Sequence, residues 1–127
     1  MGGAILLILL ATAACLTPSS DGFGTHQQLG LAQCSFIQWF GIRCPSCGMT
    51  TSWSYMMRGQ VLASMRCNVG GAYLALLAMA SGPWMLISGL RGRWFGGPLH
   101  ETVIAALGAL AVILTISDWL LRNFILI

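Results

Sequence analysis

Two cysteines stand beside a proline and a glycine in the run Cys44-Pro45-Ser46-Cys47-Gly48. Thiols at this spacing can hold one side of a tetrahedral zinc ion, or they can form a reversible disulfide. The proline restricts the backbone of the turn, and the glycine lets the chain wrap around the sulfurs. This run is the part of the chain whose residue types and spacing point most directly to chemistry.

A structural zinc site needs four ligands, and the sequence before this run offers two more. Cys34 and His26 would complete a set with Cys44 and Cys47, in the pattern His-x7-Cys-x9-Cys-x2-Cys. The inner pair has the spacing of a zinc half-site, whereas the outer spacings match no standard zinc finger. Asp21 is the one acid in this part of the sequence, so the pattern favours a structural zinc over a catalytic one.

Two other interpretations of these cysteines stay open. Cys47 comes just before a predicted short helix, and the dipole at a helix N-terminus stabilises a thiolate. Cys44 and Cys47 would then be a redox pair whose disulfide is resolved by Cys34. No βαβ pattern surrounds the run, so a thioredoxin-like domain is not expected. In the third interpretation the cysteines are structural or inert, as we expect for Cys15 and Cys67.

The composition is that of a membrane protein. Hydrophobic residues make up 57% of the 127 residues and charged residues 7%, against about 25% charged in average soluble domains. The six basic residues are all arginines and are spread over predicted loops, so nucleic acid is not an expected partner. The sequence contains no paired carboxylates, serine triad or glycine-rich phosphate loop, so a structural or interaction module is favoured, with a membrane thiol–disulfide oxidoreductase using Cys44 and Cys47 as the alternative.

The elements predicted from hydropathy form a single all-α membrane domain. We expect three transmembrane helices, at about residues 2–16, 68–90 and 103–121. The first is short for a span, which needs about 17–25 residues, so a cleaved signal peptide and a lipid anchor at Cys15 are alternatives. Residues 17–67 form a cysteine-bearing loop with a short interfacial helix over 49–57. A second helix then begins near Gln60 and runs into the next span.

Asp118 lies within the last predicted span and raises transport as a further function. An acid inside a span is costly and is a functional candidate by default. Arg122, however, lies four residues further on, and Trp119 is typical of the end of a span. We therefore expect an interfacial ion pair between Asp118 and Arg122.

The predicted spans place the cysteine loop and the C-terminus on one side of the membrane. That side carries four arginines, and the other carries two together with the N-terminus, so the charge bias favours a cytoplasmic cysteine loop only slightly. Residues 17–67 contain too little apolar material to fold alone, so we expect sulfur to cross-link them. The expected partners are the lipid bilayer and either another membrane protein or a second copy of the chain.

Several positions around the cysteines resemble those of a known family: Cys34, Gly41, Cys44-Pro45-Ser46-Cys47-Gly48-Met49-Thr50, Gly59 and Asn68. The family is a bacterial membrane family known as domain of unknown function 2752, and the resemblance covers about residues 24–122. Thr51 stands where the family usually has an arginine, and Val69 where it usually has a proline, so an anion-binding role of that arginine would be missing here. The resemblance implies a small helical protein of the bacterial inner membrane and supplies no activity or ligand.

Overall fold

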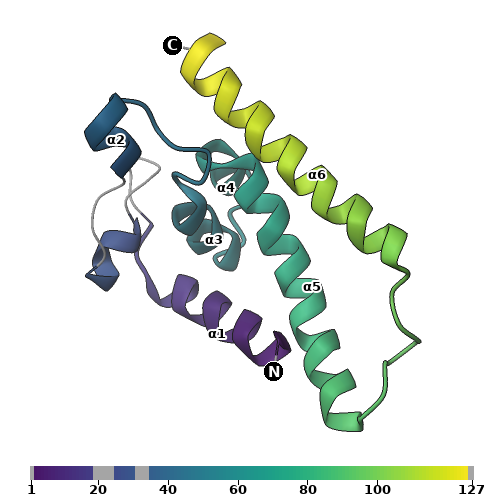
Figure 1. The fold of residues 1–127 in the computed structure, drawn as a ribbon. Helices are drawn as coiled ribbons and strands as arrows, with labels where there is room; N and C mark the ends of the chain where they lie inside the picture. Colours follow the sequence, from purple (N-terminus) through teal and green to yellow (C-terminus); the bar gives the residue numbers. More distant parts are fainter. Residues whose placement is uncertain (1, 19–24, 31–34, 126–127) are drawn as a thin grey trace.

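The computed structural model describes residues 2–18, 25–30 and 35–125, without the side chain of His26, and all regular elements in these ranges are helical (Figure 1). This confirms the all-α prediction for the described residues. The elements in chain order are α1 (Gly2–Cys15), η1 (Thr25–Leu29), α2 (Ser35–Phe40), α3 (Met49–Met57), α4 (Val61–Cys67), α5 (Val69–Arg91), α6 (Glu101–Leu120) and η2 (Leu121–Ile125).

Two of the described helices are long and apolar enough to cross a membrane. They are α5, with 23 residues, and α6 continued by η2, with 25 residues. Both agree with the predicted spans to within a few residues. Helix α1 has 14 residues, so its length of about 21 Å falls short of a bilayer core of about 30 Å. The expectation of three spans therefore becomes two helices of spanning length and one shorter apolar helix.

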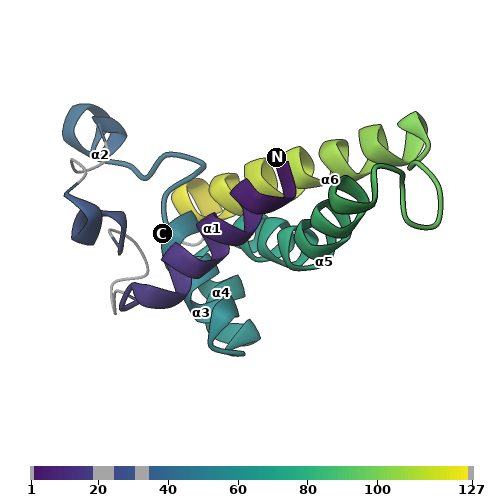
Figure 2. The ribbon, with the colours of Figure 1, turned by 90° about the horizontal axis from the view of Figure 1, so that it is seen from below.

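Helix α1 packs closely against α5, and the two lie side by side in Figures 1 and 2. Gly3 is buried at their contact. A Cβ atom at this position would lie 2.7 Å from the carbonyl oxygen of Gly82 and 3.0 Å from the Cα of Leu86. The side chain of Leu7 lies over Gly82 one turn further along α1. The two backbones can approach this closely because neither glycine carries a side chain.

Helices α5 and α6 meet through a second glycine. A Cβ atom at Gly70 would lie 2.9 Å from the Cβ and 3.0 Å from the Cα of Thr115. The Thr115 hydroxyl turns back to donate to the carbonyl of Ala111 at 2.8 Å, so it needs no partner in α5. Further along, the Tyr73 hydroxyl donates to the carbonyl of Leu107 at 3.1 Å. These contacts hold α6 against the first part of α5.

Helices α3 and α4 form a short hairpin beside α5, and Figure 2 shows it projecting away from α1, α5 and α6. The turn between them uses Gly59 at φ +75°. Met56 of α3 packs on Ala72 and Ala75 of α5, and Trp53 covers this small apolar cluster. The predicted helix over 49–57 is confirmed.

The sequence predicts that the helix beginning near Gln60 runs on into the membrane span. This prediction is wrong at Asn68. Helix α4 ends at Cys67, and Asn68 has the extended dihedral angles φ −166° and ψ 112° before α5 begins at Val69. The helical run is therefore interrupted at this residue. The reason is that the side chain of Asn68 has partners that an unbroken helix could not reach, as described below.

The close contact at Gly70 leads to a prediction about stability. Gly70→Ala should lower the free energy of unfolding by about 1–3 kcal/mol, because the added methyl group would collide with the hydroxyl, Cβ and Cα of Thr115. Gly108→Ala is the matched control, since its Cβ would meet nothing within 4 Å, and alanine favours a helix by about 0.5–1 kcal/mol. Thermal unfolding in detergent measures both. Equal stability of the two variants would contradict the close packing of α5 and α6.

Candidate functional site

The cysteine turn brings two sulfur atoms together. The sulfurs of Cys44 and Cys47 lie 3.4 Å apart without a disulfide bond, and both residues are partly exposed. The turn is closed by the Cys47 amide, which donates to the carbonyl of Cys44 at 3.0 Å, and the hydroxyl of Ser46 lies 3.2 Å from the Cys44 sulfur. Gly48, at φ +85°, then forms the N-cap of α3. The sequence-predicted half-site is therefore a compact pair of thiols before a helix N-terminus.

The other two proposed zinc ligands fall outside what the structure describes. Cys34 lies outside the described residues, and the same is true of the His26 side chain. Among the described residues, no three His, Cys, Asp or Glu side chains come together in a group that could hold a metal ion. The backbone of His26 belongs to η1, which is held against α3 by a hydrogen bond between the buried hydroxyls of Thr25 and Thr51. The segment that carries His26 thus lies beside the first turn of α3.

Asn68 connects the cysteine turn to the start of α5. Its side-chain nitrogen donates to the carbonyl of Pro45 at 3.1 Å and to that of Cys47 at 3.2 Å. Its side-chain oxygen accepts from the amide of Gly71 at 2.8 Å and so caps α5. The residue is only 2% exposed. One buried amide therefore fixes the position of the turn relative to the helix.

Two fully buried serines extend this polar cluster between α3 and α4. The hydroxyls of Ser52 and Ser64 lie 2.7 Å apart, and the Ser64 hydroxyl also reaches the carbonyl of Ser52 at 2.7 Å. The Ser52 hydroxyl lies 3.1 Å from the carbonyl of Asn68. Buried polar groups are costly unless they are paired, and here each one has a partner. We call Ser52, Ser64 and Asn68 the polar hub.

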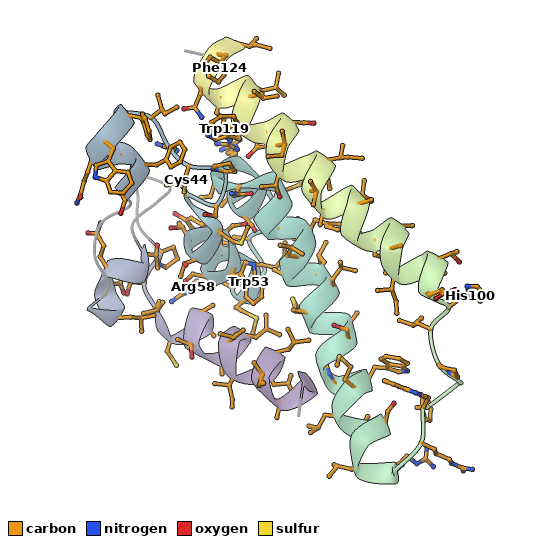
Figure 3. All side chains as sticks on the ribbon, in the orientation of Figure 1. Cys44, Trp53, Arg58, His100, Trp119 and Phe124 are labelled. Carbon is orange, nitrogen blue, oxygen red and sulfur yellow. The ribbon has the colours of Figure 1, made fainter. Side chains whose placement is uncertain are left out.

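A third buried serine joins the hairpin to α1. The hydroxyl of Ser54 donates to the carbonyl of Leu16 at 2.8 Å, and Arg58 donates to the same hydroxyl at 2.8 Å. Figure 3 shows Arg58 between α1 and α3. Sequence reasoning missed the role of this serine and of the two serines of the polar hub. The available signal was small polar residues inside a predicted helix, at Ser52, Ser54 and Ser64, where hydroxyls need partners other than water.

The end of α6 closes the same region, as Figure 3 shows for Cys44 and Trp119. The predicted ion pair is confirmed, with Arg122 Nε 2.8 Å from the carboxylate of Asp118. The same carboxylate oxygen accepts from the amide of Val69 at 3.4 Å, and Arg122 donates to the carbonyl of Met65 at 3.1 Å. The indole of Trp119 donates to the carbonyl of Arg43, just before the cysteine turn. Asp118 therefore has structural partners at the start of α5, and these leave the transport hypothesis without support from its surroundings.

Cys67 lies close to this region but differs from the pair in the turn. It is buried, and burial raises the pKa of its thiol, while the positive charges of Arg122 and Arg43 act in the opposite direction. A raised pKa keeps the thiol protonated near neutral pH, which disfavours metal binding and thiol exchange. The position agrees with its expected role as a small apolar residue.

The central position of Asn68 gives a second prediction. Asn68→Ala removes the α5 cap and both donors to the turn, and should cost at least about 1–3 kcal/mol of unfolding free energy. Asn68→Asp keeps an oxygen for the cap but no donors, so it should expose Cys44 and Cys47 to alkylation while the amide of Gly71 stays protected from hydrogen exchange.

The control for both variants is Asn123→Ala, because among the described residues Asn123 donates one long bond, of 3.4 Å, to the carbonyl of Arg43 and one bond to the carbonyl of Trp119. It should leave the alkylation rates within about twofold of wild type. If Asn68→Asp and Asn123→Ala give the same alkylation rates, the amide of Asn68 does not hold the turn.

Comparison with known proteins shows a similarity to one family of proteins. No curated protein and no solved structure matches the chain. The sequence model of one family, described as a protein of unknown function (DUF2752), matches residues 34–82, which include the cysteine turn, α3, α4 and the larger part of α5. The resemblance seen in the sequence is thus confirmed for the polar hub and the turn that it holds, and over these residues the chain is similar to the uncharacterised family DUF2752.

Proposed function

We propose that this chain is a small helical membrane protein whose cysteine turn binds a structural metal ion, and that the metal-stapled loop forms an interaction module for another membrane protein. The observation that carries the metal is the distance of 3.4 Å between the sulfurs of Cys44 and Cys47. Two thiolates on a tetrahedral zinc ion, with Zn–S bonds of about 2.3 Å, lie about 3.8 Å apart. The turn is therefore close to the geometry that zinc requires of its first two ligands.

Placement in a membrane is supported by the surface of α6. Only 6% of its most apolar 18-residue stretch is buried inside the protein, whereas the core helix of a soluble protein is mostly buried. Large apolar side chains such as Val112 and Ile113 are 63% and 60% exposed. Such a surface is unfavourable in water and favourable in lipid. Helix α6 is also far from the N-terminus, so it is not a signal sequence.

Cys34 and His26 are the proposed remaining ligands. The hydrogen bond between Thr25 and Thr51 supports the choice of His26, because it holds the neighbouring backbone against the helix that follows Cys47. A zinc ion bound by all four residues would connect the chain before α2 to the turn after it. The bound metal would supply a rigid cross-link, and the polar hub would hold that cross-link at the start of α5.

A redox pair is the second candidate, and it rests on the local surroundings of the same thiols. The N-terminus of α3 has no side-chain cap, and the Ser46 hydroxyl lies 3.2 Å from the sulfur of Cys44, where it can donate to a thiolate. In this reaction the two thiols would become a disulfide, and their two electrons and two protons would reduce a disulfide of a partner protein to its dithiol.

The metal proposal predicts about one zinc ion per chain in detergent-purified protein kept reduced, measured by elemental analysis. Cys44→Ser and Cys47→Ser should each remove most of it, because each variant takes away one thiolate of the closely spaced pair and zinc affinity falls when a thiolate ligand is lost. Cys34→Ser and His26→Ala should lower it as well. Cys15→Ser, which changes an exposed cysteine of α1, is the control and should keep the full content.

Wild-type protein with far less than one zinc per chain would overturn the metal proposal. Alkylation of Cys44 and Cys47 in cells separates the second candidate from it. A redox pair should be labelled much less under oxidising than under reducing conditions, and equal labelling in both would exclude it.

A further inference from the structure

The end of α5 opposite to the cysteine turn carries a folded-back turn that two aromatic contacts hold in place. The rings of Trp84 and Trp94 stack with their centroids 5.1 Å apart. The indole of Trp84 donates to the carbonyl of Phe95 at 2.8 Å, and the amide of Phe95 donates to the hydroxyl of Ser88 at 3.0 Å. The helix itself ends at Arg91, and Gly92 caps it with a φ of +69°. We call residues 91–96 the arginine turn.

Two arginines of this turn face a small cavity. Arg91 and Arg93 line a space of about 300 Å³ together with Trp94, Phe95 and Gly96. The guanidinium of Arg91 lies 5.4 Å from the ring centroid of Phe95, which orients it across the turn. Among the described residues, no carboxylate pairs with either arginine. The ion pair of the described residues joins Arg122 and Asp118, near the cysteine turn. The cavity therefore has two positive charges and no negative one.

An apolar cleft of about 350 Å³ adjoins this cavity and shares Arg93 and Trp94 with it. Its other walls come from the start of α1 and the last turns of α5: Gly2, Gly3, Met85, Ser88, Gly89 and Gly92. Its glycines leave space because they carry no side chains, and a Cβ atom at Gly89 would meet nothing within 4 Å. A cationic cavity next to an apolar cleft has the shape and chemistry needed to bind an anionic amphiphile.

We propose that the arginine turn and this cleft bind one anionic glycerophospholipid, with its phosphodiester at Arg91 and Arg93 and one acyl chain between α1 and α5. Guanidinium groups match phosphate oxygens in geometry and charge. A zwitterionic headgroup would bring its own ammonium towards the two arginines, so an anionic headgroup is preferred. Tryptophans at the end of a span lie at the depth of lipid headgroups. The inference rests on the membrane placement proposed above and is independent of the metal.

The test is native mass spectrometry of the detergent-purified chain, titrated with dioctanoyl-phosphatidylglycerol and with dioctanoyl-phosphatidylcholine. The apparent affinity for phosphatidylglycerol should be at least about tenfold higher. The double variant Arg91→Gln/Arg93→Gln should lose about tenfold or more of it, because it removes both charged hydrogen-bond donors. Arg66→Gln removes an exposed arginine of α4 at the other end of the protein, and this control should bind like wild type.

A second variant separates a lipid from a soluble anion. Gly89→Leu fills the apolar cleft without changing the charge, so it should weaken phosphatidylglycerol binding while competition by inorganic phosphate stays unchanged. Circular dichroism and zinc content, measured in the same samples, show whether each variant is folded and whether the cysteine site is intact. Because the cysteine site lies at the other end of the protein, the two sites can fail separately.

Three results would overturn the lipid site. The first is equal affinity for the two lipids, and the second is unchanged phosphatidylglycerol binding by the arginine double variant. The third is normal phosphatidylglycerol binding by Gly89→Leu, with inorganic phosphate displacing the lipid equally well from this variant and from wild type. The third result would assign the cavity to a soluble anion. Recovery of the chain in the soluble fraction without detergent would overturn the membrane placement itself, and this outcome is distinct from a membrane-bound chain that does not bind phosphatidylglycerol.

Discussion

A buried amide must find partners for its two donor hydrogens and its oxygen, and at Asn68 this requirement determines how the helices meet. The residue stands between α4 and α5 in an extended conformation, and its side chain reaches two carbonyls of the cysteine turn and one amide of α5. In a region of low dielectric these bonds are strong and their loss is expensive. The position of the two thiols at the start of α3 therefore depends on a residue more than twenty positions away.

The surrounding hydroxyls explain how the α3–α4 hairpin is ordered with few large apolar side chains in its core. Ser52, Ser54 and Ser64 are completely buried, and each donates to a backbone carbonyl outside its own helix. The sequence suggested that sulfur would have to cross-link this part of the chain, but hydrogen bonds supply the order of the hairpin. A metal at the cysteine turn would then act mainly on the chain before it, around η1 and α2, where fewer contacts to the helices are described.

Features set by local patterns could be predicted from the sequence. The helix over 49–57, the span ending near Arg91 and the ion pair of Asp118 follow from an apolar length, a stop signal and an i,i+4 spacing. The break at Asn68 could not, because an apolar run reads as one helix until the partners of the amide are known. For the same reason the half-site of Cys44 and Cys47 was visible, whereas its support by Asn68 depended on tertiary contacts.

Helix α1 contacts both ends of the molecule. Near its start, Gly3 packs on α5, and the first residues of α1 line the apolar cleft next to the arginine turn. Just after its end, the carbonyl of Leu16 accepts the hydroxyl of Ser54 in the hairpin. Without α1, that buried hydroxyl would lose its backbone acceptor, and the close-packed surface at Gly82 would be uncovered. The fold therefore depends on α1 at both ends of the molecule, through a close glycine contact with α5 and a backbone acceptor for a buried hydroxyl.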